Sequence, residues 1–590
     1  MKGQTLGRLL KLGYILSFIL FPLLVMGWMS QTLANIPLRL AVFCLLSLGG
    51  AWLFHKAWPH HGWSIALLLT TLGYGTAYKL ATFIPDVSTN PFSLAWSEAS
   101  RYYYASLWFS KQIYGLAVPP SVLHPSRYLL QSLPFLLPNA SLVLLRAWQV
   151  VLWILTTTLT SWLLARRLFT SGQKRSLLIT LSMIAWAILF LFQGPVYYHL
   201  LVMVILMLWG YDSKLTWRTL ILVLLASLWA GISRVNWLPV PGLLAAGLYL
   251  MEVRVSDKPI WRYLLPPAIW VLAGTAIAYA SQAAYQSWSG NPQAWFGSSF
   301  TSDLLWYRLL PNPTFPMGIL PSAVLVSLPI IGLIMMRLDK RWHQYRLIRI
   351  FGLAGILSIL FAGGVVVSVK IGGGSNLHNL DAYLTLLLVI GSYIYFDRFF
   401  PDSPTRPVED VQEKVQPTPN NLRKSLEVIL IVAALVFPLY FTLSIGGTFP
   451  HPDFSKAQAA LKSINVTTYQ AVKEGGEVLF ISQRHLLTFD YIQEVPLVPE
   501  DELVFLMEMA MSDNAAYLDK FHDDVSHQRF AMIVSEPLVI QYQGRNHSFG
   551  EENDAWVRRV SEPVLCYYEP ATQLEAANVV LYTPRTTPCQ

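Results

Sequence analysis

Long apolar runs recur through the first three quarters of the chain, and they restrict its fold more than any other feature. A helix needs about 20 predominantly apolar residues to cross the hydrocarbon core of a bilayer. By that measure about thirteen segments are expected to span a membrane. They lie near residues 12–29, 36–54, 63–84, 141–163, 177–193, 198–211, 219–233, 236–251, 264–283, 317–336, 348–369, 381–396 and 425–445. The sequence therefore predicts an α-helical polytopic membrane protein.

Composition agrees, because 54% of the residues are hydrophobic and only 13% are charged. That leaves too few polar side chains to cover several water-soluble domains. The net charge of +8 is the sum of two unlike parts: residues 1–448 hold 32 Lys and Arg against 14 Asp and Glu, whereas residues 449–590 hold 10 against 20. Neither part is typical of a surface that binds nucleic acid. Membrane lipids are the expected surroundings, and no nucleic acid partner is expected.

The basic residues predict the sidedness of the loops. If the N-terminus is cytoplasmic, 23 Lys and Arg fall in cytoplasmic segments and eight fall in the opposite loops and span ends. This is the asymmetry that the positive-inside rule describes. It predicts an odd number of spans in the plasma (inner) membrane, with a transmembrane domain over residues 1–448 and an extracytoplasmic domain over residues 449–590.

The terminal region is predicted to be a small α/β domain. Strand-like runs occur at residues 478–481, 530–534, 564–568 and 579–582, and a helical stretch lies near residues 500–521. Cys566 and Cys589 lie on the oxidising side and could form a disulfide, although the sequence leaves this pairing open.

Three extracytoplasmic loops, at residues 85–139, 284–316 and 370–380, are longer or more polar than a turn requires. Because they face the same side as the terminal domain, a polar ligand site beneath that domain is expected. In the first loop, residues 92–109 place apolar and aromatic side chains at helical spacing. This pattern predicts a helix in the plane of the lipid headgroups that carries Glu98.

Each acidic residue of the first loop has an ordinary structural alternative. Glu98 could form a surface ion pair with Arg101, three residues along the same helix. Asp86 could be a turn residue at the end of a span.

Basic residues in these loops are candidates for binding a phosphate. His124 and Arg127 precede a short apolar helix, and Arg234 stands beside Asn236 between two spans. Either arginine could instead extend to lipid phosphates. Lys370 opens a glycine-rich segment whose backbone could approach a ligand closely or form a plain turn. The polar side chains that follow are Asn376, His378, Asn379 and Asp381.

The first loop resembles that of GT-C glycosyltransferases. It contains an acidic residue, a Tyr-rich helix, the pair His124-Pro125 and an apolar helix, and Arg146 then opens the next span. With about thirteen spans and an external terminal domain, the chain is similar to lipid A aminoarabinose transferases, protein O-mannosyltransferases and bacterial oligosaccharyltransferases.

The resemblance implies a polyprenyl-phosphate-linked sugar donor and transfer of the sugar to a lipid, glycan or protein acceptor outside the cytoplasm. Such a transfer needs a base for the proton of the acceptor and cations for the departing phosphate. We assign the base to Glu98, with Asp86 in reserve. The expected phosphate-binding residues are Lys370, Arg234, Arg127 and His124, and the expected substrate-binding residues are Arg101, Tyr103, Asn236, Asn376, His378, Asn379 and Asp381.

The chain also departs from the family pattern. Ser97 stands where the first acid of an Asp-Glu pair often occurs, Ser126 replaces a second proline after His124, and two extra spans precede the loop. Because Ser97 removes one of two adjacent acids, no required metal is predicted, although a divalent metal is possible. The alternative functions are a transporter or flippase of lipid-linked saccharides and a non-catalytic scaffold.

Overall fold

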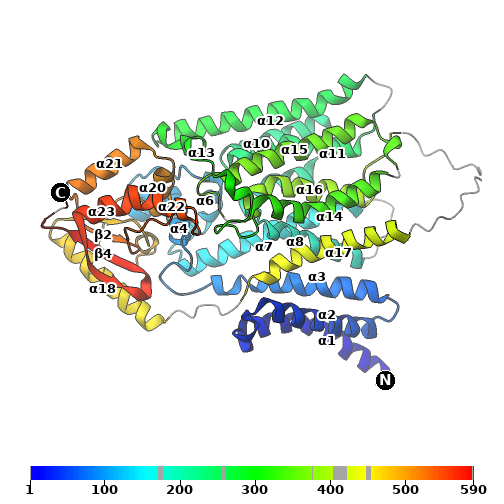
Figure 1. Cartoon of the computed structure of the whole chain (residues 1–590), viewed down its shortest axis with the longest axis horizontal. Coiled ribbons are helices and arrows are strands. Elements are labelled where there is room, and N and C mark those ends of the chain that lie inside the picture. Colours follow the sequence, from blue (N-terminus) through cyan, green and yellow to red (C-terminus); the bar gives the residue numbers. More distant parts are fainter. Residues whose placement is uncertain are drawn as a thin grey trace, which may run out of the picture.

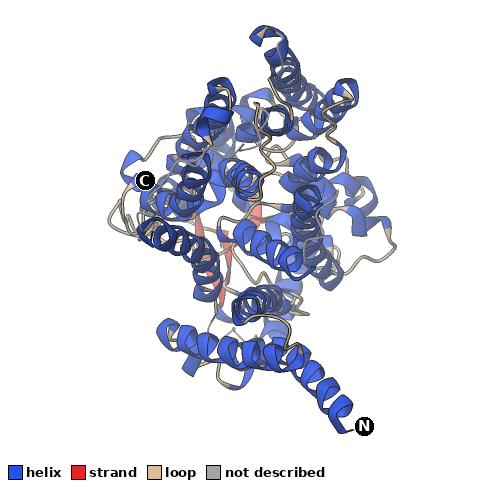
Figure 2. Ribbon diagram, turned by 90° about the vertical axis from the view of Figure 1, so that its right-hand side faces the viewer, coloured by secondary structure: helices blue, strands red, loops and turns tan. Residues whose placement is uncertain are grey.

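The computed structural model describes residues 2–169, 177–255, 259–339, 341–374, 376–402, 421–446, 453–587 and 589. A long bundle of roughly parallel helices occupies most of the molecule, and a small mixed domain caps one end of it (Figure 1). The N-terminal helix begins at the end of the bundle remote from this domain. A view along the bundle shows the strands only behind the helices, in the terminal domain (Figure 2).

Every segment predicted to span the membrane coincides with a helix, but within the described residues only eight helical segments are long and apolar enough to cross. The chain is therefore a multi-pass membrane protein with fewer full-length spans than the expected thirteen. The eight segments are formed by α1 (Lys2–Leu23) with η1 (Leu24–Trp28), α2 (Ile36–Ala57), α7 (Leu142–Phe169), α12 (Ile260–Trp288), α14 (Ile319–Asp339), α15 (Leu347–Val369), η10 (Leu377–Leu380) with α16 (Asp381–Tyr395), and α17 (Asn421–Ser444).

Five further helices complete the bundle. Three are apolar but shorter than a full span, namely α8 (Leu177–Gln193), α9 (Tyr198–Gly210) and α10 (Thr216–Gly231). The other two are α3 (Trp63–Ala81) and α11 (Val240–Glu252). These five account for the difference between the expected and the observed number of full-length spans.

Helix α16 forms the centre of the bundle. Its sequence is apolar on every side, which is the pattern of a helix surrounded by others. Nearly all of it is buried, and it packs against α11, α14 and α15. The amino-terminal end of α16, which begins at Asp381, points toward the terminal domain and thus places polar residues under that domain.

The terminal domain contains a four-stranded sheet with helices packed around it, so the predicted α/β architecture is confirmed. The strands β1 (Glu477–Phe480), β2 (Phe530–Ser535), β3 (Tyr568–Leu574) and β4 (Val579–Pro584) follow the order β1-β2-β4-β3, and only the β1–β2 pair is parallel. The helices are α18 (Phe454–Lys473), α19 (His485–Thr488), α20 (Leu503–Met511), α21 (Ala515–Ser526), α22 (Gly550–Trp556) and α23 (Glu562–Tyr567). The expected boundary after residue 448 lies outside the described residues.

Two local predictions in this domain need correction. Residues 564–568 are not a strand, because they belong to α23 and only Tyr568 opens β3. Pro563 lies inside a helical run that continues from α22 through a π-helical turn (η11, Val557–Ser561) into α23, and Val560 and Val564 are four residues apart and both face the core. The expected helix near residues 500–521 is two helices, and Asn514 caps the second by accepting a hydrogen bond from the Tyr517 amide at 3.2 Å.

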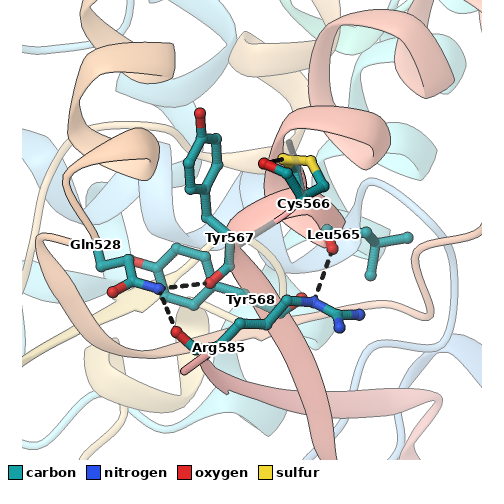
Figure 3. The surroundings of a disulfide bond; sticks show 7 residues. Gln528, Leu565, Cys566, Tyr567, Tyr568 and Arg585 are labelled. Carbon is teal, nitrogen blue, oxygen red and sulfur yellow. Dashed lines mark hydrogen bonds between the residues drawn. A yellow bond between two sulfur atoms is a disulfide. The ribbon is translucent and has the colours of Figure 1, made fainter. Parts of the chain in front are cut away.

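Cys566 and Cys589 form a disulfide that ties the chain end to α23 (Figure 3). Around it, the Arg585 guanidinium donates to the carbonyl of Leu565 at 3.0 Å, and the Gln528 amide donates to the carbonyls of Tyr567 and Arg585. The pairing that the sequence left open is therefore present.

Candidate functional site

The first long loop, residues 85–139, folds into short helices at the end of the bundle that faces the terminal domain. These are η3 (Ile84–Asp86), α4 (Glu98–Ser106), η4 (Leu107–Phe109), α5 (Ser110–Tyr114), α6 (Pro125–Gln131) and η5 (Leu133–Leu136). The Tyr-rich helix α4 is shorter than expected and packs against α6 and α19. Its residues Tyr102, Tyr103 and Tyr104 are buried, so α4 lies beneath the terminal domain and is not an exposed surface helix.

Glu98 is buried in an ion pair with Arg146 of α7, so the alternative pairing with Arg101 is wrong. The Arg146 guanidinium donates to both carboxylate oxygens of Glu98, at 2.9 Å and 3.2 Å. It also donates to the carbonyls of Ser88, Asn90 and Phe92. Burial raises the pKa of Glu98, but the hydrogen bonds and charge of Arg146 outweigh it and hold that pKa below its usual range.

The segment from Ser88 to Leu94 is therefore fixed from two sides. Arg146 and Glu98 bind it from the bundle, and Glu98 also accepts a hydrogen bond from the Leu94 amide at 2.5 Å. From the terminal domain, His485 bonds to the carbonyl of Pro91 at 2.7 Å. Glu98 is occupied as a structural anchor, which leaves it poorly placed to accept a proton from a substrate.

Asp86 differs from Glu98 because its carboxylate makes no hydrogen bond or ion pair with any described residue. It lies at the end of η3 and is exposed. Partial loss of hydration and the like charge of Glu98 raise the pKa of Asp86 above its usual range, whereas the positive charge of Arg101 opposes the rise. Asp86 is thus an available carboxylate with enhanced basicity.

Four side chains from three segments meet near α6, and we call them the Arg–His cluster: Arg101, His124, Arg127 and His199. The Arg127 guanidinium lies 4.7 Å from the ring centre of Tyr197, and the rings of His124 and His199 are 6.2 Å apart. Burial raises the pKa of the neighbouring Tyr128 to about 12, and the positive charges of Arg127 and Arg101 oppose this rise.

Within the part of the chain that the structure describes, no side chain of the cluster forms an ion pair with a carboxylate. Arg101 and Arg127 are half-buried, their Nε atoms have no hydrogen-bond partner, and neither forms an ion pair with a described carboxylate. His199 is 1% exposed, and neither of its ring nitrogens has a hydrogen-bond partner among the described residues. Buried polar groups are normally satisfied, so this arrangement indicates a ligand that supplies the missing acceptors.

His124 sits in a turn with positive φ of 48° and is held by the junction between α10 and η6 (Val235–Trp237). Its Nδ1 donates to the carbonyl of Ser233 at 3.0 Å, and the hydroxyls of Ser126 and Ser233 are 2.7 Å apart. Burial, together with the charge of Arg234, lowers the pKa of His124 to about 3. The ring is therefore neutral at pH 7, with Nε2 as an acceptor.

Arg234 does lie next to the polar residues expected to accompany it, Asn379 and Asp381, but these groups form hydrogen bonds and an ion pair with one another. Arg234 donates to Asp381 at 2.9 Å and to the Asn379 side chain at 2.5 Å, and Trp237 donates to Asp381 at 2.8 Å. The Asn236 amide donates to the Asn379 carbonyl at 3.3 Å. The charge of Arg234 is thus matched within the protein.

Asn376 and His378 also bond to each other. The ring Nδ1 of His378 lies 2.6 Å from the Asn376 side-chain oxygen, and its ring centre is 6.2 Å from that of Tyr197. His378 therefore borders the Arg–His cluster across Tyr197.

Lys370 contacts the terminal domain, because its Nζ lies 2.6 Å from the carboxylate of Glu508 on α20. The adjacent Gly372 amide donates to Glu552 at 2.8 Å. A Cβ on Gly373 would lie 2.6 Å from the carbonyl oxygen of Ser368, so a close backbone approach requires this glycine. The segment forms a packed turn. Lys370, the cation expected to bind phosphate, and the amide of the nearby Gly372 are both engaged by acids.

The sequence reasoning missed Arg146 as the partner of Glu98 and missed His199 altogether. A signal for His199 existed, because a histidine next to two tyrosines at the start of an apolar run is an unusual polar group inside the membrane region. Among the described residues, no group of three or more His, Cys, Asp or Glu side chains is arranged to hold a metal ion.

The chain matches no protein-family model and no curated protein sequence.

Proposed function

We propose that this chain is a membrane glycosyltransferase that moves a sugar from a polyprenyl-phosphate-linked donor to an acceptor on the side of the terminal domain. The Arg–His cluster carries the proposal. Nearby Arg146, Arg234 and Lys370 each have a carboxylate partner, whereas Arg101 and Arg127 have none among the described residues. A phosphate supplies the missing negative charge and several acceptor oxygens, and guanidinium groups match its geometry.

The transfer then uses the residues around the cluster. The acceptor hydroxyl attacks the anomeric carbon and gives its proton to the Asp86 carboxylate, while the bond between that carbon and the phosphate oxygen breaks. The electron pair leaves with the lipid phosphate, whose charge Arg101 and Arg127 stabilise. We assign the base to Asp86 because its carboxylate forms no hydrogen bond or ion pair with a described residue and has a raised pKa, whereas Glu98 is committed to Arg146.

Binding of undecaprenyl phosphate to the full-length protein in nanodiscs, followed by native mass spectrometry, tests the phosphate site. Loss of a hydrogen bond to a charged group costs about 1.5–3 kcal/mol, so Arg101→Met and Arg127→Met should each weaken binding roughly tenfold or more. Lys111→Met is the matched control, since Lys111 is an exposed cation of the same loop. Wild-type affinity in the Arg101/Arg127 double variant would refute the site.

The alternative function is a transporter or flippase of lipid-linked saccharides. The observation in its favour is a cavity of about 320 Å³ at the opposite end of the bundle. Its lining includes Arg166, Glu252 and Tyr393, so both ends of the bundle carry charged sites. In sealed vesicles with a labelled polyprenyl-phosphate sugar, a transferase moves the label to an acceptor, whereas a flippase moves the intact lipid across the bilayer.

A further inference from the structure

A cavity of about 270 Å³ lies where the first loop, the middle loop and the terminal domain meet. We call it the interdomain pocket. Tyr103 and Tyr104 of α4 line one part of it and Trp295 of the loop at residues 284–316 another. The terminal domain contributes residues 499–502, Phe505, Ala516, Tyr517, Lys520 and Phe521. Because all three parts contribute, the pocket exists only in the assembled chain.

One wall of the interdomain pocket is aromatic. The ring centre of Trp295 is 5.4 Å from that of Phe505 and 5.3 Å from that of Tyr517, and the last two rings are 5.3 Å apart. Such a wall offers apolar faces, and the Tyr517 hydroxyl accepts a hydrogen bond from the Asp501 amide at 3.1 Å. Large apolar faces with a few fixed polar groups are typical of a small-molecule site.

Beside these rings, the lining carries three consecutive acidic residues of the terminal domain. Asp501 and Glu502 are each 4% exposed, and Glu502 accepts hydrogen bonds from the Val504 amide at 3.1 Å and from the Tyr104 hydroxyl. Glu500 has one oxygen 3.5 Å from Lys520, whereas its other oxygen is buried with no hydrogen-bond partner among the described residues. The pocket thus offers an acceptor that lacks a donor.

The charge of the lining selects against anions. The lining holds three acidic residues and one lysine, and the Arg484 guanidinium, which donates to the carbonyls of Pro499 and Glu500, offsets a further negative charge. The net charge of the group stays negative, which disfavours a phosphate or carboxylate ligand. Hydroxyl and ammonium groups, in contrast, donate to carboxylates. The interdomain pocket therefore differs in sign from the Arg–His cluster.

The two sites are close neighbours. Tyr104 lines the interdomain pocket, and its ring centre is 5.1 Å from that of Tyr128. The Arg127 guanidinium in turn lies 5.8 Å from the Tyr128 ring centre. Two tyrosines are thus enough to connect a site for hydroxyl-rich ligands with a site for phosphate.

We propose that the interdomain pocket binds a saccharide, neutral or amine-bearing, that forms part of the acceptor. The aromatic wall stacks on the apolar face of a sugar ring, and the carboxylates accept hydrogen bonds from its hydroxyl or amino groups. The assignment of this saccharide to the acceptor rests on the transfer proposed above. It implies that the acceptor carries a glycan. Saccharide binding itself does not depend on that transfer.

Saturation-transfer NMR on the full-length protein in nanodiscs tests the proposal. The probes are chitobiose, its de-N-acetylated form and a glucuronate-containing disaccharide. The first two should receive saturation and the third should not. Absence of transfer to both of the first two, or preferred binding of the glucuronate, overturns the proposal.

Two variants locate the site. Trp295→Ala should raise the dissociation constant of the bound disaccharide tenfold or more, and Glu500→Gln threefold or more. Trp306→Ala and Glu494→Gln are the matched controls, because both residues are exposed and neither lines the pocket. Unchanged affinity in both pocket variants overturns the assignment, and Glu500→Gln alone decides if Trp295→Ala does not fold.

Undecaprenyl phosphate binding separates the two proposals. Both pocket variants should keep wild-type affinity for this lipid, since they leave the Arg–His cluster intact. If the wild-type protein binds the disaccharide but not the lipid phosphate, the proposed transfer fails and the saccharide site stands. If it binds the lipid phosphate but neither chitobiose nor its de-N-acetylated form, only the pocket assignment fails.

Discussion

Arg146 and Arg127 lie at the same end of the helical bundle, yet only Arg146 is paired with a described carboxylate. Arg146 is fully buried, and Glu98 matches its charge, with three backbone carbonyls taking its other hydrogen bonds. Arg127 is half-buried, and no described acid pairs with it. Because an unpaired charge is costly to remove from water, the first arginine is explained by the fold and the second calls for a partner from outside it.

The two acids of the first loop give the strongest test of this contrast. Asp86→Asn should lower sugar transfer from a polyprenyl-phosphate donor by about 100-fold or more, because the acceptor loses its general base. Its thermal stability and its affinity for undecaprenyl phosphate should stay at the wild-type level. Transfer at the wild-type rate in Asp86→Asn would remove Asp86 as the base. A lower rate in Glu98→Gln would not make Glu98 the base, because that change also weakens the ion pair with Arg146.

Arg146→Met should produce the largest loss of stability. It leaves the Glu98 carboxylate buried without its cation, a change that costs about 3–5 kcal/mol. Thermal unfolding of the purified protein measures it, with Arg101→Met as the control that should change stability little. The double variant Glu98→Gln/Arg146→Met should be more stable than the sum of the single changes predicts, and strict additivity would contradict the ion pair.

The positions of the helices could be predicted from the sequence, because apolar content is a local property of each segment. The convergence of Arg234 with Asn379 and Asp381 followed from placing the loops on one side of the membrane. The partner of Glu98 could not be predicted in this way, because Arg146 lies 48 residues away and only tertiary packing brings the two side chains together. Lys370 was assigned to phosphate for a related reason: the carboxylate that neutralises it belongs to another domain, 138 residues later.

Asp501 extends the contrast to an acid that forms no ion pair with a described residue. Burial raises its pKa to about 6, with Tyr517 and Arg484 opposing the rise and Glu500 and Asp524 adding to it. The folded protein therefore holds this proton more tightly than the unfolded chain does. The resulting stability is fully present below about pH 4 and is lost as the pH rises through about 6, by at most about 3 kcal/mol.

Unfolding of the full-length protein between pH 4 and pH 7 measures this contribution. Asp501→Asn should flatten the pH dependence of the unfolding temperature, whereas Glu494→Gln, an exposed acid in the same domain, should leave it unchanged. An identical pH dependence in Asp501→Asn and the wild type would show that Asp501 titrates normally.

The ion pair between Lys370 and Glu508 should give the smallest of these changes in stability. It links the bundle to the terminal domain, and both side chains are about 15% exposed. A double-mutant cycle with Lys370→Met and Glu508→Gln should yield a coupling of about 1 kcal/mol in the unfolding free energy. The same Lys370→Met variant should bind undecaprenyl phosphate as the wild type does, in contrast to Arg127→Met. The charge of Lys370 is already neutralised by Glu508, so it is not available to a phosphate. A large loss of lipid affinity in Lys370→Met would contradict this expectation. It would mean that Lys370 leaves Glu508 when the lipid binds and that a paired cation also contacts the phosphate.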